Sequence, residues 1–246
     1  MRKYPAFVII SLAYVFGGGS LLMFGTFCYA GPLHLIKLGL TQSKKLLLDS
    51  FLSLAFFLQH SGMVRKSFRN YLARFVPETY VSALYAFTSG IVLIAVVVLW
   101  QETSGTVVKV GGVPGLLLRA AFVASIAGFI WGIKALGYFD PFGIRTIVSH
   151  LHGKKPKVIP LTIRGPYRWV RHPLYLFVLV MIWSHPYLTW DRLLFNILWT
   201  VWIYIGAILE ERDLVEDFGD AYRRYQKKVP MIVPPRISPS WPGDAD

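Results

Sequence analysis

Six apolar runs, separated by more polar segments, constrain most strongly what this chain can fold into. The runs lie at about residues 5–30, 45–63, 80–100, 113–138, 173–188 and 193–209. A helix needs roughly 20 mainly apolar residues to cross a bilayer, and most of the runs approach or exceed that length. The run 173–188 is the shortest, so it either crosses marginally or forms one arm of a half-inserted hairpin. The sequence therefore predicts an all-α polytopic membrane helix bundle of about six spans.

The composition agrees with a membrane protein rather than with a nucleic-acid-binding protein. Of the 246 residues, 54% are hydrophobic, and the formal net charge is +13. The positive charges cluster in loops between the apolar runs, where topology and anionic lipid head groups explain them. We expect a single domain over 1–246, because no polar stretch is long enough to fold separately. Within it we expect a four-span part (1–138), a cofactor-binding part (139–233) and a loose proline-rich tail (234–246).

Lysine and arginine are unevenly distributed between the two sides of the predicted bundle. With six spans, the segments on the side of both termini hold 19 of these residues, and those on the opposite side hold 6. Cytoplasmic segments carry such an excess in membrane proteins. We therefore expect both termini in the cytoplasm.

The segment Arg164–Tyr175 contains more polar chemistry than the approach to an apolar run requires. It reads Arg-Gly-Pro-Tyr-Arg-Trp-Val-Arg-His-Pro-Leu-Tyr. Arginine holds carboxylates and phosphates by paired hydrogen bonds, and the two prolines fix the backbone. We interpret the segment as part of a binding site for an anionic or zwitterionic cofactor. For Arg164 and Arg168, a basic loop that only obeys the positive-inside rule is an equal alternative.

Two adjacent carboxylates, Glu210 and Glu211, follow the last apolar run. They lie on the same predicted cytoplasmic side as the segment Arg164–Tyr175. Topology does not explain acidic residues there, and ionisable groups at a membrane boundary are candidates for function. They could pair with the arginines of the preceding loop, bind a ligand ammonium group, or do both. A purely structural ion pair is the alternative.

The stretch after these carboxylates has the pattern of an amphipathic helix. Leu214, Phe218, Tyr222 and Tyr225 recur at three- and four-residue spacing. Such a helix can fold back over the cytoplasmic end of the bundle, and Gly219 would kink it or divide it in two.

A further candidate is His60, at the cytoplasmic end of the run 45–63. It could face the cofactor cavity as a base, or it could be a hydrogen-bonded packing histidine. The one cysteine, Cys28, and the scattered histidines lack the spacing of a zinc site, so we expect no metal.

Several motifs, taken in order, resemble the isoprenylcysteine carboxyl methyltransferase superfamily of membrane methyltransferases. They are Gly165-Pro-Tyr167, Arg171-His-Pro-Leu-Tyr175, Glu210-Glu211, Phe218-Gly219, Tyr222, Tyr225 and Val229-Pro230. Other motifs resemble one branch of it, the NnrU-related bacterial methanethiol S-methyltransferases. They are Gln59-His-Ser61, Arg74-Phe-Val-Pro-Glu78, Trp100-Gln101, Phe139-Asp-Pro-Phe-Gly143 and Glu210-Glu-Arg-Asp-Leu214. The resemblance covers nearly the whole chain.

This resemblance implies an enzyme of the bacterial inner membrane that uses S-adenosyl-L-methionine to methylate a small thiol, converting methanethiol to dimethyl sulfide. Carried over by position, the cofactor-binding residues are Tyr167, Arg168, Arg171, His172, Tyr175, Glu210 and Glu211. A thiol reacts as its thiolate, so a base or a nearby cation assists the reaction. His60 is the candidate base, and Arg145 is the alternative cation. The expected partners are the thiol and membrane lipids, not nucleic acid; the oligomeric state stays open.

Two other functions also stay open. The methyl acceptor could be a lipid or isoprenoid carboxylate, which needs a lipid-accessible groove between spans. Alternatively, the chain could be a non-enzymatic membrane protein, such as a haem-binding assembly factor with His60 and His172 as axial ligands.

Overall fold

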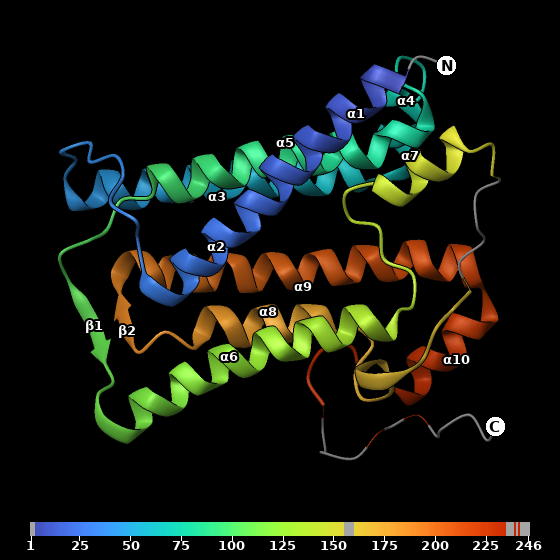
Figure 1. Cartoon of the computed structure of the whole chain (residues 1–246). Coiled ribbons are helices and arrows are strands. Elements are labelled where there is room, and N and C mark those ends of the chain that lie inside the picture. Colours follow the sequence, from blue (N-terminus) through green and yellow to red (C-terminus); the bar gives the residue numbers. More distant parts are fainter. Residues whose placement is uncertain (1–2, 155–159, 235–238, 240, 242–246) are drawn as a thin grey trace. The chain divides into compact units, whose positions relative to one another are not determined.

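The computed structural model describes residues 3–154, 160–234, 239 and 241, with side chains from residue 6 onward. Five of its helices are long and apolar enough to cross a membrane (Figure 1). These are Ala6–Ala30, Gln42–Val64, Glu78–Leu99, Gly112–Ala135 and Trp190–Phe218. The predicted all-α polytopic membrane bundle is confirmed, and the chain is an integral membrane protein.

The first span consists of three helical segments that follow one another without a break. They are α1 (Lys3–Leu12), the π-helical segment η1 (Ala13–Gly18) and α2 (Gly19–Ala30). η1 packs closely on α5 (Glu78–Leu99). A Cβ atom on Gly90 of α5 would lie 2.5 Å from the carbonyl oxygen of Phe16. The absence of a side chain at this glycine therefore sets how closely the two backbones approach.

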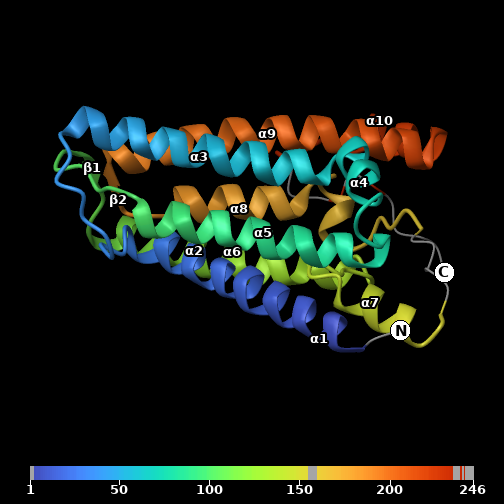
Figure 2. The same ribbon diagram turned by 90° about the horizontal axis from the view of Figure 1, so that it is seen from above.

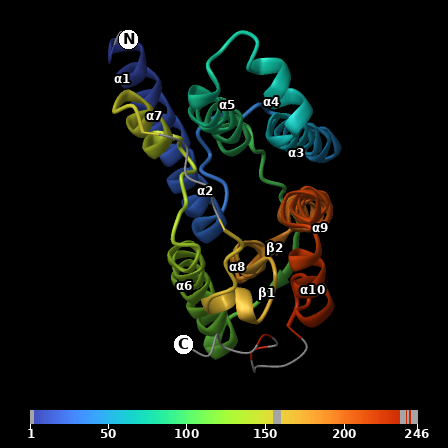
Figure 3. The ribbon, with the colours of Figure 1, turned by 90° about the vertical axis from the view of Figure 1, so that its right-hand side faces the viewer.

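The chain divides into two compact units by its internal contacts. The described residues of the first unit lie within Met1–Val108, Asp140–Val158 and Tyr187–Leu198. In this unit α3 (Gln42–Val64) packs along α5, and the short α4 (Lys66–Leu72) lies between them in the chain (Figure 2). The helix α7 (Ile144–Leu151) contacts both α1 and α5 (Figure 3).

One end of the first unit is held together by a buried polar network around the start of α9 (Trp190–Phe218). Asp191 accepts hydrogen bonds from the Trp100 indole at 3.2 Å and from the Thr103 backbone N–H at 2.9 Å. Arg192 donates to the backbone carbonyls of Phe27 and Cys28 at the end of α2. The strands β1 (Thr106–Lys109) and β2 (Tyr187–Thr189) pair beside this network.

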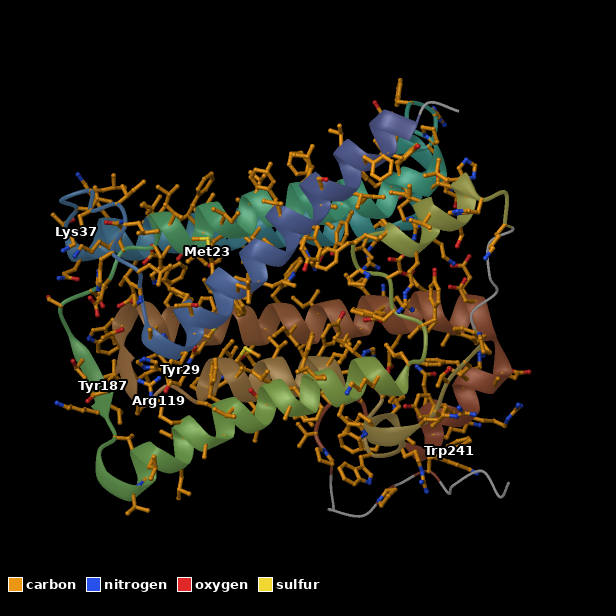
Figure 4. All side chains as sticks on the ribbon, in the orientation of Figure 1. Met23, Tyr29, Lys37, Arg119, Tyr187 and Trp241 are labelled. Atoms are coloured by element: carbon orange, nitrogen blue, oxygen red, sulfur yellow. The ribbon has the colours of Figure 1, made fainter. Side chains whose placement is uncertain are left out.

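Aromatic and basic side chains gather toward that same end of the first unit. Figure 4 shows Tyr29, Lys37 and Tyr187 there, and all three are at least partly exposed. Aromatic and basic side chains of this kind are typical of a membrane–water interface.

The described residues of the second unit lie within Lys109–Phe139, Ile159–Pro186 and Trp199–Asp246. Here α6 (Gly112–Ala135) packs along α8 (Pro173–Trp183), side by side in Figures 1 and 3. A Cβ atom on Gly132 would lie 2.6 Å from a methyl carbon of Leu174, so the glycine lets these helices pack closely.

The predicted run 173–188 forms a much shorter helix than the other runs do. α8 has 11 residues, which at 1.5 Å per residue is about 16 Å, roughly half of a hydrocarbon core of about 30 Å. The run still extends along most of α6, since Leu174 lies beside Gly132 and Pro186 beside Gly115, which agrees with the alternative of a marginal crossing. The described part of the chain therefore has five helices long enough to span, where the apolar runs predicted about six.

The end of α9 and the next helix form the predicted amphipathic stretch. α9 continues past Glu210 and Glu211 to Phe218, and α10 covers Asp220–Lys228. Between them Gly219 has φ +55° and ψ −131°, a conformation that side-chain-bearing residues rarely adopt. Of the two predicted alternatives, Gly219 therefore divides the stretch in two.

The apolar face of α10 packs on its own unit. Tyr222, Tyr225 and Val229 are buried, and they pack against Leu161, Ile163, Leu214, Val215, Phe218 and Trp241.

Most of the predicted tail, residues 234–246, lies outside the described residues. Trp241 is described: its backbone N–H donates to the Arg168 carbonyl at 3.0 Å, and its ring meets Tyr225 edge-on. The predicted single domain and its internal boundaries stay predictions.

Candidate functional site

The backbone around Arg171 and His172 is fixed by the chain that follows α10. The Arg171 N–H donates to the Pro230 carbonyl and the His172 N–H to the Met231 carbonyl, both at 2.9 Å. Pro173 then begins α8, where its missing N–H would have no helical partner in any case. These bonds bring the Arg171-His172 segment and residues 230–231 together.

Arg171 and Glu211 form a two-point ion pair. Arg171 Nε bonds to Glu211 Oε1, and Nη2 bonds to Oε2 at 3.0 Å. Arg171 Nη1 donates to the backbone carbonyls of Gln226, at 3.0 Å, and Val229. Four of the five guanidinium N–H groups thus have partners within the protein. Arg171 therefore joins α9, α10 and the segment before α8.

Glu211 accepts further hydrogen bonds from three other side chains. His172 Nε2 lies 3.2 Å from Oε1, Gln226 Nε2 donates to Oε2 at 2.9 Å, and the Tyr222 hydroxyl donates to Oε1 at 3.4 Å. Burial, and then the charge of Glu211, raise the pKa of Tyr222, which keeps its hydroxyl a neutral donor. The carboxylate of Glu211 is therefore saturated by groups of the protein itself.

Glu210 has a different environment, although it is the next residue. Its side chain is 45% exposed, against 12% for Glu211. The Tyr175 hydroxyl donates to Glu210 Oε2 at 2.7 Å, and His172 Nδ1 lies 3.7 Å from the same oxygen. The rings of His172 and Tyr175 stack, with an interplanar angle of 5°. The imidazole thus lies between the two carboxylates, and only Glu210 presents an accessible one.

Comparisons with known proteins show which family the chain belongs to. The family model described as phospholipid methyltransferase matches residues 113–221, which include the Arg171-His172 segment and both carboxylates. A methanethiol S-methyltransferase of a Pseudomonas species is 37% identical over 205 residues, which is 80% of this chain and 76% of the relative. The chain belongs to the methanethiol S-methyltransferase family.

Relatives from other bacteria carry the same name. The methanethiol S-methyltransferase of Crocosphaera subtropica is 29% identical over 87% of this chain and 91% of its own length. That of Mycobacterium tuberculosis is 32% identical over 73% of this chain and 74% of its own length. No solved structure matches the chain. The chain is thus a membrane methyltransferase that needs a methyl donor, which favours an enzyme over a haem-binding assembly factor.

Two other predicted residues of this methyltransferase, Tyr167 and Arg168, lie on the 3₁₀ turn η2 (Gly165–Arg168) in the same unit. Tyr167 is buried, and its carbonyl accepts a hydrogen bond from the Tyr225 hydroxyl. Arg168 Nε donates to the Trp241 carbonyl at 3.2 Å. Burial is the main cause that raises the pKa of Tyr167 and of Tyr225, so both phenols stay neutral.

The methyltransferase also has polar groups that the sequence did not single out. One of them is Gln226, which donates a hydrogen bond to Glu211. Gln226 also lines a surface hollow of about 380 Å³, together with Val215, Arg223 and Lys227. Gln226 lies four residues after Tyr222, and both bond to Glu211, so their helical spacing was the available signal. The two cations of the hollow are suited to an anionic group.

The predicted catalytic residues, His60 and Arg145, both belong to the first unit. The Tyr85 hydroxyl lies 3.0 Å from His60 Nδ1 and 2.9 Å from Nε2. Arg145 lies near the start of α7, where its backbone N–H donates to Asp140 at 3.2 Å. The catalytic roles of these two residues stay predictions.

Proposed function

We propose that this methyltransferase uses S-adenosyl-L-methionine to methylate a small thiol, most simply methanethiol, which becomes dimethyl sulfide. The observation that carries the proposal is the accessible Glu210 carboxylate beside the stacked His172 and Tyr175 rings, in a chain of this family. The relatives' names support the choice of methanethiol.

The residues present fit this cofactor. When bound, S-adenosyl-L-methionine supplies a methyl group activated by a sulfonium. Glu210 offers a carboxylate for an ammonium group, and the aromatic face of Tyr175 favours a cation. Arg168 and the fifth guanidinium N–H of Arg171, which is not used for Glu211, Gln226 or Val229, are donors for a carboxylate. Tyr167 is buried and precedes Arg168 on the turn η2.

The two carboxylates have different tasks in this proposal. Glu210 contacts the cofactor. Glu211 is a positioning residue, because its hydrogen bonds hold Arg171 and His172 in place. A buried arginine left without its carboxylate is strongly destabilising, so loss of Glu211 disturbs the site as a whole. Both losses lower cofactor binding, by different routes.

On the acceptor side, His60 is the proposed base. A thiol attacks as its thiolate, so His60 accepts the proton that the thiol loses. Arg145 is the alternative, as a cation that favours the thiolate. Most of the rate would come from orienting the two reactants and excluding water.

The charge distribution supports an orientation for the enzyme. With 19 Lys and Arg on the side of both termini and 6 on the other side, we place the termini in the cytoplasm of a bacterial cell, at the inner membrane. A soluble cofactor is available on that side.

A second candidate acceptor is a lipid or an isoprenoid carboxylate, and the match to the phospholipid methyltransferase family model favours the lipid. One experiment separates the two acceptors. Purified protein is incubated with methyl-labelled S-adenosyl-L-methionine, with methanethiol and with phospholipid, and label is followed in volatile product and in lipid. Label in dimethyl sulfide supports the thiol. Label in lipid alone supports the second candidate, and absence of cofactor binding would contradict both.

A further inference from the structure

A cluster of polar side chains lies between α3 and α5 in the first unit. It consists of Gln59, His60 and Met63 on α3, and Tyr85, Thr88 and Ser89 on α5. The three residues of α5 are spaced by three and four positions, so they share one face of that helix. On this face Gln59 contacts Thr88 and Ser89, and the adjacent His60 contacts Tyr85, one turn away along α5.

The side-chain amide of Gln59 uses only its donor end. Nε2 lies 3.0 Å from Met63 Sδ, 3.2 Å from Thr88 Oγ1 and 3.1 Å from Ser89 Oγ. A thioether sulfur only accepts hydrogen bonds, so the amide nitrogen, rather than the oxygen, belongs on that side. Among the described residues, the buried Oε1 atom of Gln59 has no hydrogen-bond partner.

A buried carbonyl oxygen without a donor costs free energy, the more so in a membrane where water does not reach it. The unpaired Oε1 atom of Gln59 therefore suits a ligand that donates a hydrogen bond. His60 lies next to it in the chain, with the Tyr85 hydroxyl at 2.9 Å and the Phe56 ring at 5.0 Å between centroids.

Gln59 and His60 contact uncharged side chains, which belong to Met63, Thr88, Ser89, Tyr85 and Phe56. A ligand that carries a carboxylate into such surroundings would lose its hydration without gaining a cation. A small neutral molecule with one weak donor, such as a thiol, has no such cost.

We propose that Gln59 determines acceptor specificity: its Oε1 accepts the S–H hydrogen of a small neutral thiol beside His60. The inference rests on the proposed function and names the acceptor site of that reaction. As the sulfur attacks, the S–H proton leaves its hydrogen bond with Gln59 Oε1 and passes to His60, and the sulfur electron pair forms the new S–C bond. The bond between the methyl carbon and the donor's sulfonium breaks, leaving the donor as a neutral thioether.

The test uses full-length protein and the variant Gln59→Leu, which keeps a side chain of similar size without the amide. The readouts are KM and kcat for methanethiol, and the Kd of S-adenosyl-L-methionine by calorimetry. Loss of one hydrogen bond predicts a KM about tenfold higher, with the cofactor Kd unchanged. The control is Ser50→Ala on the same helix, whose hydroxyl donates to the Leu46 carbonyl in the preceding turn; its KM should match wild type.

A second arm needs only the wild-type protein. Mercaptoacetate adds a carboxylate to the thiol, and kcat/KM should fall at least about a hundredfold relative to methanethiol. Equal use of mercaptoacetate, or a Gln59→Leu KM within the wild-type error, would overturn the inference in an enzyme that makes dimethyl sulfide. A wild-type protein that does not methylate methanethiol would instead contradict the proposed function, and this inference with it.

Discussion

Arg171 and Glu211 face each other as a buried two-point ion pair, with side chains only 9% and 12% exposed. Each also bonds to α10, Arg171 through the Gln226 carbonyl and Glu211 through the Gln226 amide. The neighbouring Glu210 is 45% exposed and bonds to Tyr175. Two identical residues in succession therefore have different physical roles, and substitutions should separate them.

Glu211→Gln should destabilise the protein as well as weaken cofactor binding. The amide removes the charge opposite a buried guanidinium, and breaking a buried ion pair costs about 3–5 kcal/mol. Thermal unfolding in detergent should show a clear fall in melting temperature. A variant that melts like wild type would contradict the positioning role.

Glu210→Gln should leave stability nearly unchanged and weaken S-adenosyl-L-methionine binding. A lost charge-assisted hydrogen bond is worth about 1.5–3 kcal/mol, or roughly ten- to hundredfold in Kd. Calorimetry gives the Kd, and thermal unfolding gives the stability. Asp220→Asn is the matched control, since it removes another exposed carboxylate near by in the chain. Equal Kd values for Glu210→Gln and the control would refute the contact.

Stability above pH 10 should depend on Tyr222 and Tyr225. Their folded pKa values are raised, mainly by burial, above the value of about 10 in the unfolded chain. The native state therefore holds these protons more tightly. Their contribution is complete below about pH 10 and is lost as the pH rises further, at about 1.4 kcal/mol per pH unit for each tyrosine.

The double variant Tyr222→Phe/Tyr225→Phe checks this. It should melt lower than wild type at pH 8, because the Glu211 and Tyr167 contacts are lost. Its melting temperature should then fall less steeply between pH 10 and 11. Parallel curves for the two proteins would show that these phenols do not titrate as expected.

Gly219→Ala should disturb the junction between α9 and α10. A Cβ atom at this position meets nothing within 4 Å, so the cost is conformational and arises from φ +55°. We expect a loss of about 1–3 kcal/mol in stability. Gly206→Ala in α9 is the control: its Cβ also meets nothing, and alanine in a helix should be neutral or slightly stabilising. Similar melting temperatures for both variants would contradict the strain.

His60→Ala should slow methyl transfer while cofactor binding is largely kept. General-base catalysis typically contributes about 100- to 10,000-fold in rate. The test compares kcat with the calorimetric Kd of S-adenosyl-L-methionine. A normal kcat would remove His60 as the base and leave Arg145 as the remaining candidate.

Much of the fold follows from local sequence patterns. Runs of apolar residues predicted the long helices, and the spacing of Leu214, Phe218, Tyr222 and Tyr225 predicted the buried face of α10. Gly219 was expected to kink or divide that stretch, and its φ shows division. The length of α8 was overestimated, because β2 and the residues before it continue the apolar run without continuing the helix.

The candidate site was predicted by residue type but not by arrangement. Nothing in the sequence distinguishes Glu210 from Glu211, because their environments depend on Arg171 and Gln226, which lie 40 and 15 residues away. The open acceptor of Gln59 is likewise a tertiary feature, set by Thr88 and Ser89 on another helix. Sequence patterns identify which groups are present, whereas hydrogen-bond saturation depends on the packed structure.

The most direct measurement is transfer of a labelled methyl group from S-adenosyl-L-methionine to methanethiol by the purified protein and its Glu210→Gln variant. We predict labelled dimethyl sulfide from the wild type, and a yield reduced at least about tenfold in the variant at limiting cofactor. No labelled dimethyl sulfide from the wild type would contradict the proposed reaction, and equal yields from both proteins would contradict the role of Glu210.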